Sequence, residues 1–209
     1  TGIGSMIFLF ALGYMREEID GHVGRRGRFG RFYLYLSLFA FSMLNLLIAD
    51  NLLDFSHLSY VHAKTIGGTT AIAQARPTIE KIDSAGQRGV KVSRFIPDVV
   101  ASPFYLKFRQ FNSNLDRWFV YDFLFPSTLL MHSGGRPVGD APDDNSRAVR
   151  LHSCQTLTPE TETSTHYFFQ QSHPAGVEDQ TIKHIIFNSL IEAFNEDRDM
   201  ITAQFKNLS

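Results

Sequence analysis

The sequence predicts an α+β fold in which an antiparallel sheet is followed by a long C-terminal helix and preceded by an apolar helical hairpin. Short runs of β-branched and aromatic residues alternate with turn-forming residues through the middle of the chain, which is typical of antiparallel strands joined by short connections. Apolar residues recur at helical spacing over residues 179–205, as in an amphipathic helix. An uncharged run covers residues 32–49, and its length suits a helix that crosses a membrane.

The chain divides into two segments of different character, residues 1–49 and residues 50–209. The uncharged run in the first segment would span about 27 Å as a helix, close to a hydrocarbon core of about 30 Å. A second apolar run covers residues 6–14, and the arginine-rich loop between the two runs favours the cytoplasmic side of a membrane. The alternative is a long buried helix of a soluble protein. The second segment is predicted to be the folded α+β domain.

Five strands are predicted in the second segment, each short and rich in β-branched or aromatic residues: residues 89–96, 116–123, 127–132, 148–157 and 163–171. Turn-forming residues separate several of them, at residues 83–89, 133–137 and 142–146. The C-terminal helix then places Ile182, Ile186 and Leu190 on one apolar face.

Charge and cysteine content exclude several classes of function. The chain has 20 Lys and Arg against 21 Asp and Glu, a net charge of −1, which does not indicate a nucleic-acid partner. Cys154 is the only cysteine. The chain therefore cannot form a disulfide framework, a thiolate zinc site or an iron–sulfur cluster held by its own cysteines.

The clearest candidate site lies in residues 50–62, where Asn51, Asp54, His57 and His62 occur close together. On a regular helix His57 and His62, five residues apart, would point about 140° away from each other. Both imidazoles can reach one point only if the helix ends, tightens or bulges between them. The spacing also differs from that of His-Glu-x-x-His zinc sites.

A third ligand is available in the acidic run of the C-terminal helix. Asp197 lies three residues from both Phe194 and Met200 and so shares a face with them, whereas Glu196 and Asp199 are predicted on a solvated face. A carboxylate on an apolar face costs desolvation unless it is paired or binds a metal. Two histidines and one carboxylate form the facial triad of non-haem iron(II) oxygenases. The alternative is two surface histidines and an ordinary acidic helix end.

Residues 50–68, Asp-Asn-Leu-Leu-Asp-Phe-Ser-His-Leu-Ser-Tyr-Val-His-Ala-Lys-Thr-Ile-Gly-Gly, resemble the iron-binding segment of Rieske-type aromatic oxygenases of the vanillate O-demethylase-like branch. The likeness continues in order through Pro126-Ser-Thr-Leu-Leu-Met131, Leu157-Thr-Pro-Glu-Thr-Glu-Thr-Ser-Thr-His-Tyr-Phe-Phe169 and Ala193-Phe-Asn-Glu-Asp-Arg-Asp-Met-Ile-Thr-Ala-Gln204. This resemblance implies a monooxygenase catalytic domain with a helix-grip-like fold.

The resemblance also implies roles for individual residues. His57, His62 and Asp197 would bind a mononuclear iron(II). Asp54 resembles the acid that hydrogen-bonds a ligand histidine and carries electrons from a neighbouring subunit's Rieske cluster, and Asn51 matches a residue near the open face of the iron. His166, on a predicted strand, either contacts substrate or faces solvent.

The partners that the resemblance implies are O2, an aromatic acid or aryl methyl ether as substrate, and a reductase or ferredoxin as electron donor. It further implies a homotrimer. Residues 50–209 are predicted in the cytoplasm, and the balanced charge predicts no nucleic-acid partner. A full oxygenase of this type also carries a [2Fe-2S] Rieske cluster on two Cys and two His. No Cys precedes Cys154, so this chain does not bind that cluster and its catalytic domain lacks an electron supply of its own.

Residues 1–53 resemble a transmembrane segment of the antiporter-like subunit 5 of complex I, through Thr1-Gly-Ile-Gly-Ser5, Gly13-Tyr-Met-Arg16 and Ala49-Asp-Asn-Leu-Leu53. This resemblance supplies an alternative function, a membrane fragment of a proton-translocating NADH:quinone oxidoreductase subunit. It predicts a membrane contact through residues 1–49 where that segment is native. The two resemblances together suggest a chimera joined near residue 50.

Overall fold

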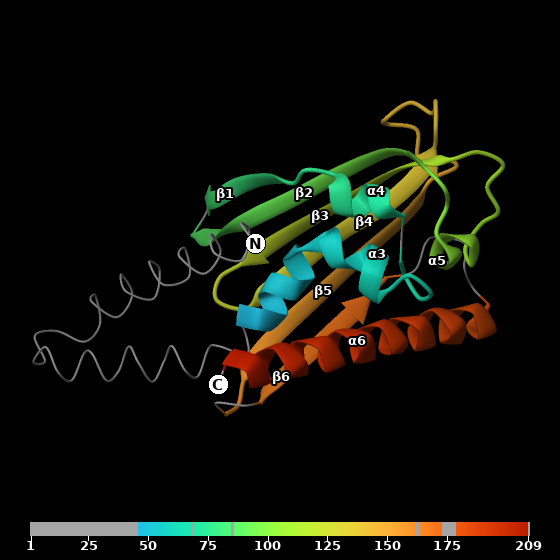
Figure 1. Cartoon of the computed structure of the whole chain (residues 1–209). Helices are drawn as coiled ribbons and strands as arrows, with labels where there is room; N and C mark the ends of the chain where they lie inside the picture. Colours follow the sequence, from blue (N-terminus) through green and yellow to red (C-terminus); the bar gives the residue numbers. More distant parts are fainter. Residues whose placement is uncertain (1–45, 68, 85, 162–163, 173–178, 209) are drawn as a thin grey trace, which may run out of the picture.

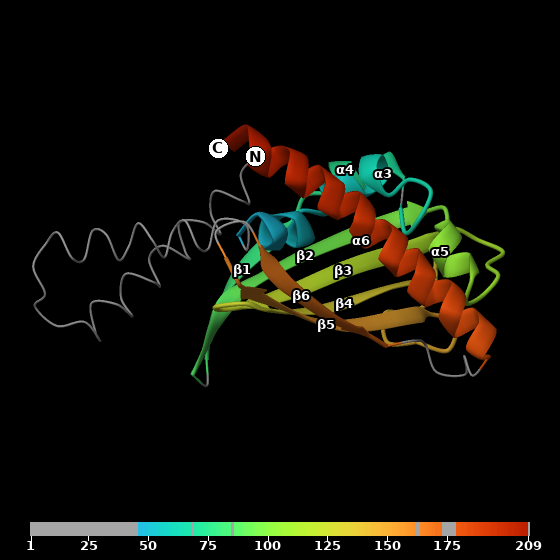
Figure 2. The same cartoon turned by 90° about the horizontal axis from the view of Figure 1, so that it is seen from below.

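A computed structural model describes residues 46–67, 69–84, 86–161, 164–172 and 179–208. These residues form a curved six-stranded antiparallel sheet with helices on one face (Figures 1 and 2). The strands pair in sequence order: β1 (Thr78–Ser84), β2 (Gln87–Val99), β3 (Leu115–Leu124), β4 (Thr128–Pro137), β5 (Val149–Pro159) and β6 (Thr165–Gln171).

Most helical residues come from the two ends of the described chain. A helix over residues 46–53 leads into the short elements η1 (Phe55–His57), α3 (Leu58–Val61) and α4 (Thr70–Gln74). A further short helix, α5 (Pro103–Leu106), lies between β2 and β3, and the chain ends in α6 (Gln180–Leu208). Figure 2 shows α6 crossing the same face of the sheet that the segment 46–74 covers. Residues far apart in the sequence therefore meet between them.

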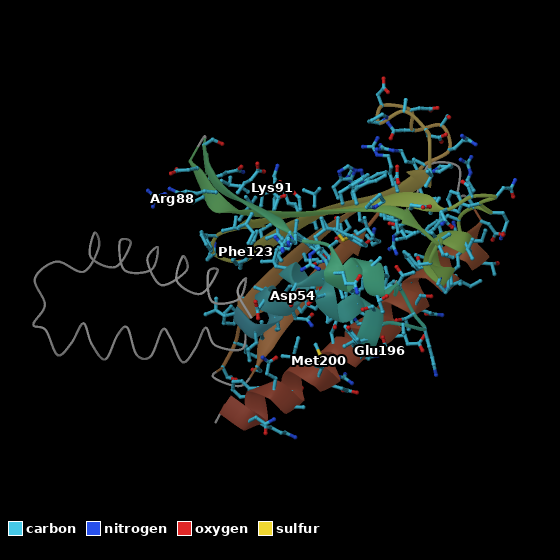
Figure 3. The ribbon with its side chains drawn as sticks, turned by 45° about the horizontal axis from the view of Figure 1, so that its top comes forward. Asp54, Arg88, Lys91, Phe123, Glu196 and Met200 are labelled. Atoms are coloured by element: carbon cyan, nitrogen blue, oxygen red, sulfur yellow. The ribbon has the colours of Figure 1, made fainter. Side chains whose placement is uncertain are left out.

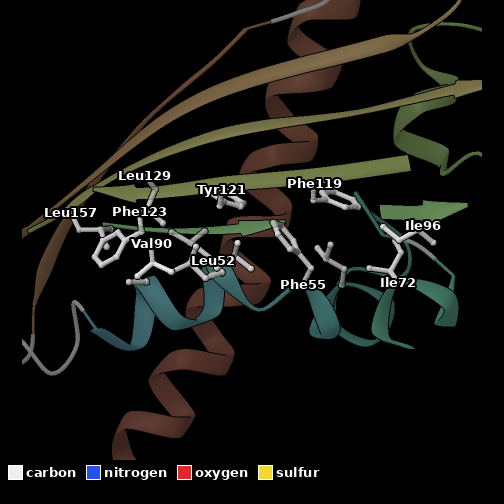
Figure 4. Packing of buried hydrophobic residues seen from close by; sticks show 14 of the residues in the cluster. Leu52, Phe55, Ile72, Val90, Ile96, Phe119, Tyr121, Phe123, Leu129 and Leu157 are labelled. Atoms are coloured by element: carbon white, nitrogen blue, oxygen red, sulfur yellow. The ribbon is translucent and has the colours of Figure 1, made fainter. Parts of the chain in front are cut away.

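The inner face of the sheet is the one that carries the core. Along β3 the residues alternate strictly between buried and half-buried, as expected for a strand with one face packed against helices. Leu52, Phe55 and Ile72 from the helical segment pack against Val90, Phe119, Tyr121, Phe123, Leu129 and Leu157 of the sheet (Figure 4). A second cluster lies under the first half of α6 and includes Phe104, Tyr105, Leu151, Ile186 and Leu190.

The predicted antiparallel sheet and long C-terminal helix are confirmed, but strand β1 was not predicted. Its sequence, Thr-Ile-Glu-Lys-Ile-Asp-Ser, is mostly charged or polar and mostly exposed. It is an edge strand that pairs only with β2 among the described strands. Charged side chains are common on edge strands because they discourage pairing with other chains, and they also hide the strand from a hydrophobicity pattern.

The prediction of a turn at residues 133–137 was wrong, because these residues are the last part of β4. The two glycines that suggested a turn make room for aromatic rings. A Cβ on Gly134 would lie 2.2 Å from a ring carbon of Trp118, and one on Gly135 would lie 2.8 Å from the ring of Tyr105. Glycine in a strand can mark such a close approach.

The predicted apolar hairpin over residues 1–49 lies almost entirely outside the described residues. Its last four residues belong to the helix 46–53, which continues across the predicted division at residue 49. Ala49, Leu52 and Leu53 of this helix are buried in the core. Across the part of the chain that the structure describes, no helix is long and apolar enough to span a membrane.

Candidate metal centre

His57 and His62 converge because the helix between them changes form, as the sequence predicts. The helix 46–53 stops at Asp54, which caps the 3₁₀ turn η1. His57 ends that turn, and His62 is the residue that terminates the single α-helical turn α3. A tightened turn followed by a helix end thus brings the two rings to a centroid distance of 5.1 Å.

Helix α6 brings Asp197 to the two histidines. The Nε2 atoms of His57 and His62 lie 3.2 Å apart. Asp197 Oδ1 lies 2.9 Å from His62 Nε2 and 3.5 Å from His57 Nε2. Within the described ranges, these three residues form the one group of histidine, cysteine or acidic side chains placed to share a metal ion. Their side chains are 16%, 1% and 11% exposed.

The hydrogen bonds of the two rings show which nitrogen faces the centre. His57 Nδ1 lies 2.5 Å from the main-chain oxygen of Asp54, and His62 Nδ1 lies 2.8 Å from Glu196 Oε2. Both partners can only accept a hydrogen bond, so each Nδ1 carries the proton. The Nε2 lone pairs of the two neutral rings therefore point at each other and at a carboxylate oxygen. These three electron-rich atoms repel one another unless a cation lies between them.

The three atoms fit a metal ion. Ligand atoms about 2.1 Å from one ion and at right angles to each other lie about 3.0 Å apart, close to the observed 3.2, 2.9 and 3.5 Å. Metal-binding histidines usually donate their other N–H to a carboxylate or a main-chain carbonyl, as both do here. Two imidazoles and one carboxylate are also the donor set of non-haem iron(II) sites.

The two histidines differ in how readily they take a proton. Burial lowers the pKa of His57 below its usual value, and the nearby Asp197 only partly offsets this effect. Burial would also lower the pKa of His62, but its hydrogen bonds with Asp197 and Glu196 outweigh burial and raise that pKa. In the absence of metal, a proton on His62 Nε2 can therefore take the place of the cation, and a metal ion has to displace it.

Glu196 was predicted on a solvated face, and its side chain is partly exposed, but it also contacts the metal centre. Asp197 does replace an apolar residue on the buried stripe of α6, and Asp199 is exposed as predicted. Glu196, however, accepts hydrogen bonds from His62 Nδ1 and from Thr65 Oγ1, at 2.8 and 2.9 Å. Figure 3 shows Glu196 on α6 beside the helical segment that carries Asp54. Helical spacing did not reveal this contact, because it depends on how a distant loop docks against α6.

The side chain of Asp54 does not contact a ligand histidine. Its Oδ1 accepts hydrogen bonds from the main-chain N and the hydroxyl of Ser56, at 3.0 and 2.7 Å, and from Arg94 Nη2 at 3.2 Å. Although burial alone would raise the pKa of Asp54, these Ser56 and Arg94 contacts lower it. The contact with His57 comes from the main-chain carbonyl of Asp54 instead. The predicted link to a ligand histidine thus exists, but through the backbone.

Two further predicted site residues lie at different distances from the centre. Asn51 is beside it, and its side-chain amide donates to Asp197 Oδ1 at 3.2 Å. His166 is on the outer face of β6, where it is exposed and lies 3.4 Å from Glu160. The structure therefore brings Asn51 to the triad and does not bring His166 there.

A group of buried polar side chains lies on the inner face of the sheet near the centre, and no pattern in the sequence predicts it. Gln155 Nε2 donates to Tyr121 Oη at 3.2 Å and to Ser153 Oγ at 3.1 Å. Gln155 Oε1 and the Tyr167 hydroxyl are buried with no hydrogen-bond partner among the described residues. We call Tyr121, Ser153, Gln155 and Tyr167 the inner polar cluster.

The inner polar cluster adjoins the metal centre through aromatic contacts and charge. Tyr121 stacks on Phe55, two residues before His57, at 5.1 Å between ring centroids. Burial raises the pKa of Tyr121 to about 12, and burial also raises the pKa of Tyr167. The charge of Asp197 contributes to both shifts. The two phenols therefore stay protonated and can act as hydrogen-bond donors beside the triad.

Comparison with known families and proteins agrees with this geometry. A family model described as the vanillate O-demethylase oxygenase C-terminal domain matches residues 45–209. The chain is 37% identical over 166 residues to a putative toluene-4-sulfonate monooxygenase system iron-sulfur subunit of Comamonas testosteroni, covering 78% of this chain and 47% of that protein. It is 32% identical to a vanillate O-demethylase oxygenase subunit of a Pseudomonas strain, covering 78% of this chain and 50% of that subunit. The chain thus spans about half the length of these relatives.

Two other similarities cover very different shares of the sequence. The crystal structure of dicamba monooxygenase bound to 3,6-dichlorosalicylic acid superposes with a TM-score of 0.64 at 28% identity, covering 75% of this chain and 44% of that chain. A stretch of 51 residues is 47% identical to NADH-quinone oxidoreductase subunit L of Mycobacterium tuberculosis, which is 24% of this chain and 7% of that subunit. A similarity that short does not establish membership of a second family.

Proposed function

Because the chain belongs to the vanillate O-demethylase oxygenase C-terminal domain family, we propose that it is the catalytic part of an aromatic-ring oxygenase or O-demethylase. His57, His62 and Asp197 hold a mononuclear iron(II) in this proposal. The observation that carries it is the convergence of two imidazole lone pairs and one carboxylate oxygen within 3.5 Å of one another. Iron(II) bound there would supply the activation of O2 for insertion of one oxygen atom into substrate.

The chain's own residues would hold the ligands and exclude water. The Asp54 carbonyl and Glu196 fix the two rings, and Asn51 orients the carboxylate through its 3.2 Å bond to Asp197 Oδ1. Phe55 packs on Tyr121, and Phe194 packs on Tyr167. The side chains packed beside the triad are thus mostly aromatic with a few polar groups among them, a composition that is typical of sites for small organic ligands.

The inner polar cluster supports an aromatic acid as substrate. Tyr121 and Ser153 accept from Gln155 and keep their own hydroxyl protons free to donate, and the Tyr167 hydroxyl has no partner among the described residues. Buried donors without acceptors are costly. A carboxylate or sulfonate on the substrate would satisfy them and turn the opposite end of the ring toward the triad. Toluene-4-sulfonate, vanillate and dicamba, the compounds in the names of the relatives, all carry such a group.

We further propose that the electrons come from a separate component and that the chain works in a homotrimer. Relatives are named as an oxygenase subunit or oxygenase component, which supports a separate reductase or ferredoxin. This chain has a single cysteine and cannot build a Rieske cluster from its own side chains. Sedimentation of the purified chain with and without bound metal tests the trimer.

Peroxide tests the reaction without an electron donor. The iron(II)-loaded chain is mixed with hydrogen peroxide and 4-methoxybenzoate, and formaldehyde and 4-hydroxybenzoate are measured. In the balanced reaction, the ether and H2O2 yield the phenol, formaldehyde and water. We expect both products from the wild-type chain and neither from Asp197→Ala. Equal product from both proteins, or none from an iron-loaded wild-type chain offered both 4-methoxybenzoate and toluene-4-sulfonate, would contradict the proposal.

A further inference from the structure

Glu196 and Asp197 are consecutive residues of α6, yet both reach the same imidazole. Asp197 Oδ1 lies 2.9 Å from His62 Nε2, and Glu196 Oε2 lies 2.8 Å from His62 Nδ1. Consecutive residues of a helix point about 100° apart, so the His62 ring has to stand edge-on against α6 to meet both. The side chain of His62 is 1% exposed, and neither of its nitrogens has access to bulk water.

Thr65 holds the Glu196 carboxylate in place. Its hydroxyl donates at 2.9 Å to Oε2, the same oxygen that accepts from His62. Thr65 is itself buried, and its main-chain N–H bonds the His62 carbonyl at 3.2 Å. Gly67 closes the same loop, because a Cβ there would lie 2.0 Å from the His62 carbonyl oxygen. The loop thus holds the main chain of His62, and the carboxylate holds its ring.

Glu196 also reaches the solvent-facing surface of α6. Its side chain is 31% exposed and lines a hollow of about 410 Å³ on the solvent side of α6, together with Asn188, Ile191, Glu192, Asn195 and Asp199. Contact with water spares the carboxylate the full desolvation cost of a buried charge. A carboxylate oxygen at 2.8 Å accepts the hydrogen bond of Nδ1–H, which leaves the Nε2 lone pair for a metal.

We propose that Glu196, held by Thr65, is a positioning residue that fixes His62 in the tautomer and orientation required for metal binding. This inference rests on the proposed metal site. It does not follow from the triad alone, because the ring could present Nε2 with Nδ1 bonded to water or to a main-chain carbonyl, as His57 does. Loss of a hydrogen-bond partner of this kind lowers metal affinity by about 10- to 100-fold in other metal sites.

Cobalt(II) binding to the full chain tests the proposal, with affinity measured by calorimetry. The second readout is proton NMR of the cobalt-loaded protein, in which each ligand Nδ1–H gives a strongly shifted signal that disappears when it exchanges with water. In the wild-type chain we expect two such signals. Glu196→Ala should bind cobalt about 10- to 100-fold more weakly and lose the signal of His62 alone. Thr65→Val, which keeps the shape but removes the donor, should weaken binding less than Glu196→Ala.

Glu196→Gln separates positioning from charge. Both hydrogen bonds fall on one oxygen, and the amide oxygen of Gln can take its place, so this variant should keep both signals and bind within about fivefold of wild type. Glu192→Ala, one turn earlier on α6, is the matched control and should leave both readouts unchanged. Circular dichroism checks that each variant is folded.

Three other results would contradict the proposed role of Glu196. Wild-type affinity with both signals in Glu196→Ala would overturn the inference while leaving the metal site in place. A Gln variant as weak as the Ala variant would overturn it as well, since charge and not position would then be what matters. No cobalt binding by the wild-type chain would overturn both the inference and the proposed function.

Discussion

The two ligand histidines are held by different parts of the molecule. His57 donates to the carbonyl of Asp54, three residues earlier, and the Asp54 side chain is tied to the sheet by Arg94. His62 donates to Glu196, which lies 134 residues later on α6. One half of the centre is therefore built locally by a capped turn, and the other depends on the docking of a distant helix. The difference implies that a side-chain change in α6 weakens metal binding through His62, whereas the main-chain support of His57 tolerates side-chain changes in the core.

Removal of a ligand side chain should have the largest effect on metal binding, and the loss should be the same for His57 as for His62. We expect His57→Ala, His62→Ala and Asp197→Ala each to reduce bound iron(II) from about one per chain to near zero, because two protein ligands seldom retain a metal that needs three. Metal analysis after gel filtration measures this. A protein that keeps its iron after any one of these changes would show that the metal is bound elsewhere.

Arg94→Met should affect stability more than metal binding. Arg94 donates to the buried carbonyl of Ile72 at 3.0 Å as well as to Asp54, and its loss leaves that carbonyl without its partner, at a cost of about 1–3 kcal/mol. The His57 bond comes from the Asp54 main chain, so cobalt affinity should change by less than about fivefold. Urea unfolding and calorimetry measure the two effects.

Glu196→Ala should show the opposite pattern of stability and metal affinity to Arg94→Met. Arg94→Met should lower stability and spare affinity, whereas Glu196→Ala should lower affinity and largely spare stability, since Glu196 is partly exposed. Matched losses of affinity in the two variants would contradict the division between a local and a distant support.

Metal binding should weaken at low pH because of His62. Its hydrogen bonds with Asp197 and Glu196 outweigh burial and raise its pKa above the usual 6.5 in the metal-free protein, and a metal must displace that proton. Below the raised pKa, the affinity for metal should fall by about tenfold per pH unit, with a decline that begins above pH 6.5. Calorimetry in buffers of different ionisation enthalpy should detect release of one proton, and a flat profile would contradict the assignment.

Without metal, the raised pKa of His62 also affects the stability of the fold. Its contribution to the free energy of unfolding is fully present below the unfolded pKa and is lost as pH rises through the folded pKa.

His166→Ala should have the smallest effect. His166 is exposed on the outer face of β6, and its pairing with Glu160 is a surface contact of a kind that seldom contributes measurable stability. We expect unchanged cobalt affinity and an unfolding free energy within about 0.5 kcal/mol of wild type. A clear loss of peroxide-driven turnover in this variant would instead restore His166 as a substrate contact.

The same division explains what the sequence could predict. Runs of β-branched and aromatic residues between turn-forming residues located β2 to β6, and helical spacing singled out Asp197 as an acid on an apolar face. The five-residue gap between His57 and His62 predicted a break in the helix, which the structure places at η1 and α3. These features are local, and periodicity reports local structure well.

The features that were missed depend on contacts across the fold. Gly134 and Gly135 are typical of a turn in the sequence, but in the fold they lie in a strand beneath the rings of Trp118 and Tyr105. Helical spacing indicates a solvated Glu196, but the loop that carries His62 and Thr65 packs on α6 and hydrogen-bonds its carboxylate. Gln155 and Tyr121 lie on strands β5 and β3, with β4 between them. None of these pairings leaves a periodic signal in the sequence.

Anomalous X-ray diffraction at the iron edge, from crystals of the full chain loaded with iron(II), tests the central claim most directly. The account predicts one strong peak within about 2.2 Å of His57 Nε2, His62 Nε2 and a carboxylate oxygen of Asp197, with both Nδ1 atoms still bonded to the Asp54 carbonyl and Glu196. A peak bound to other side chains, or no peak at the triad in fully loaded crystals, would contradict it.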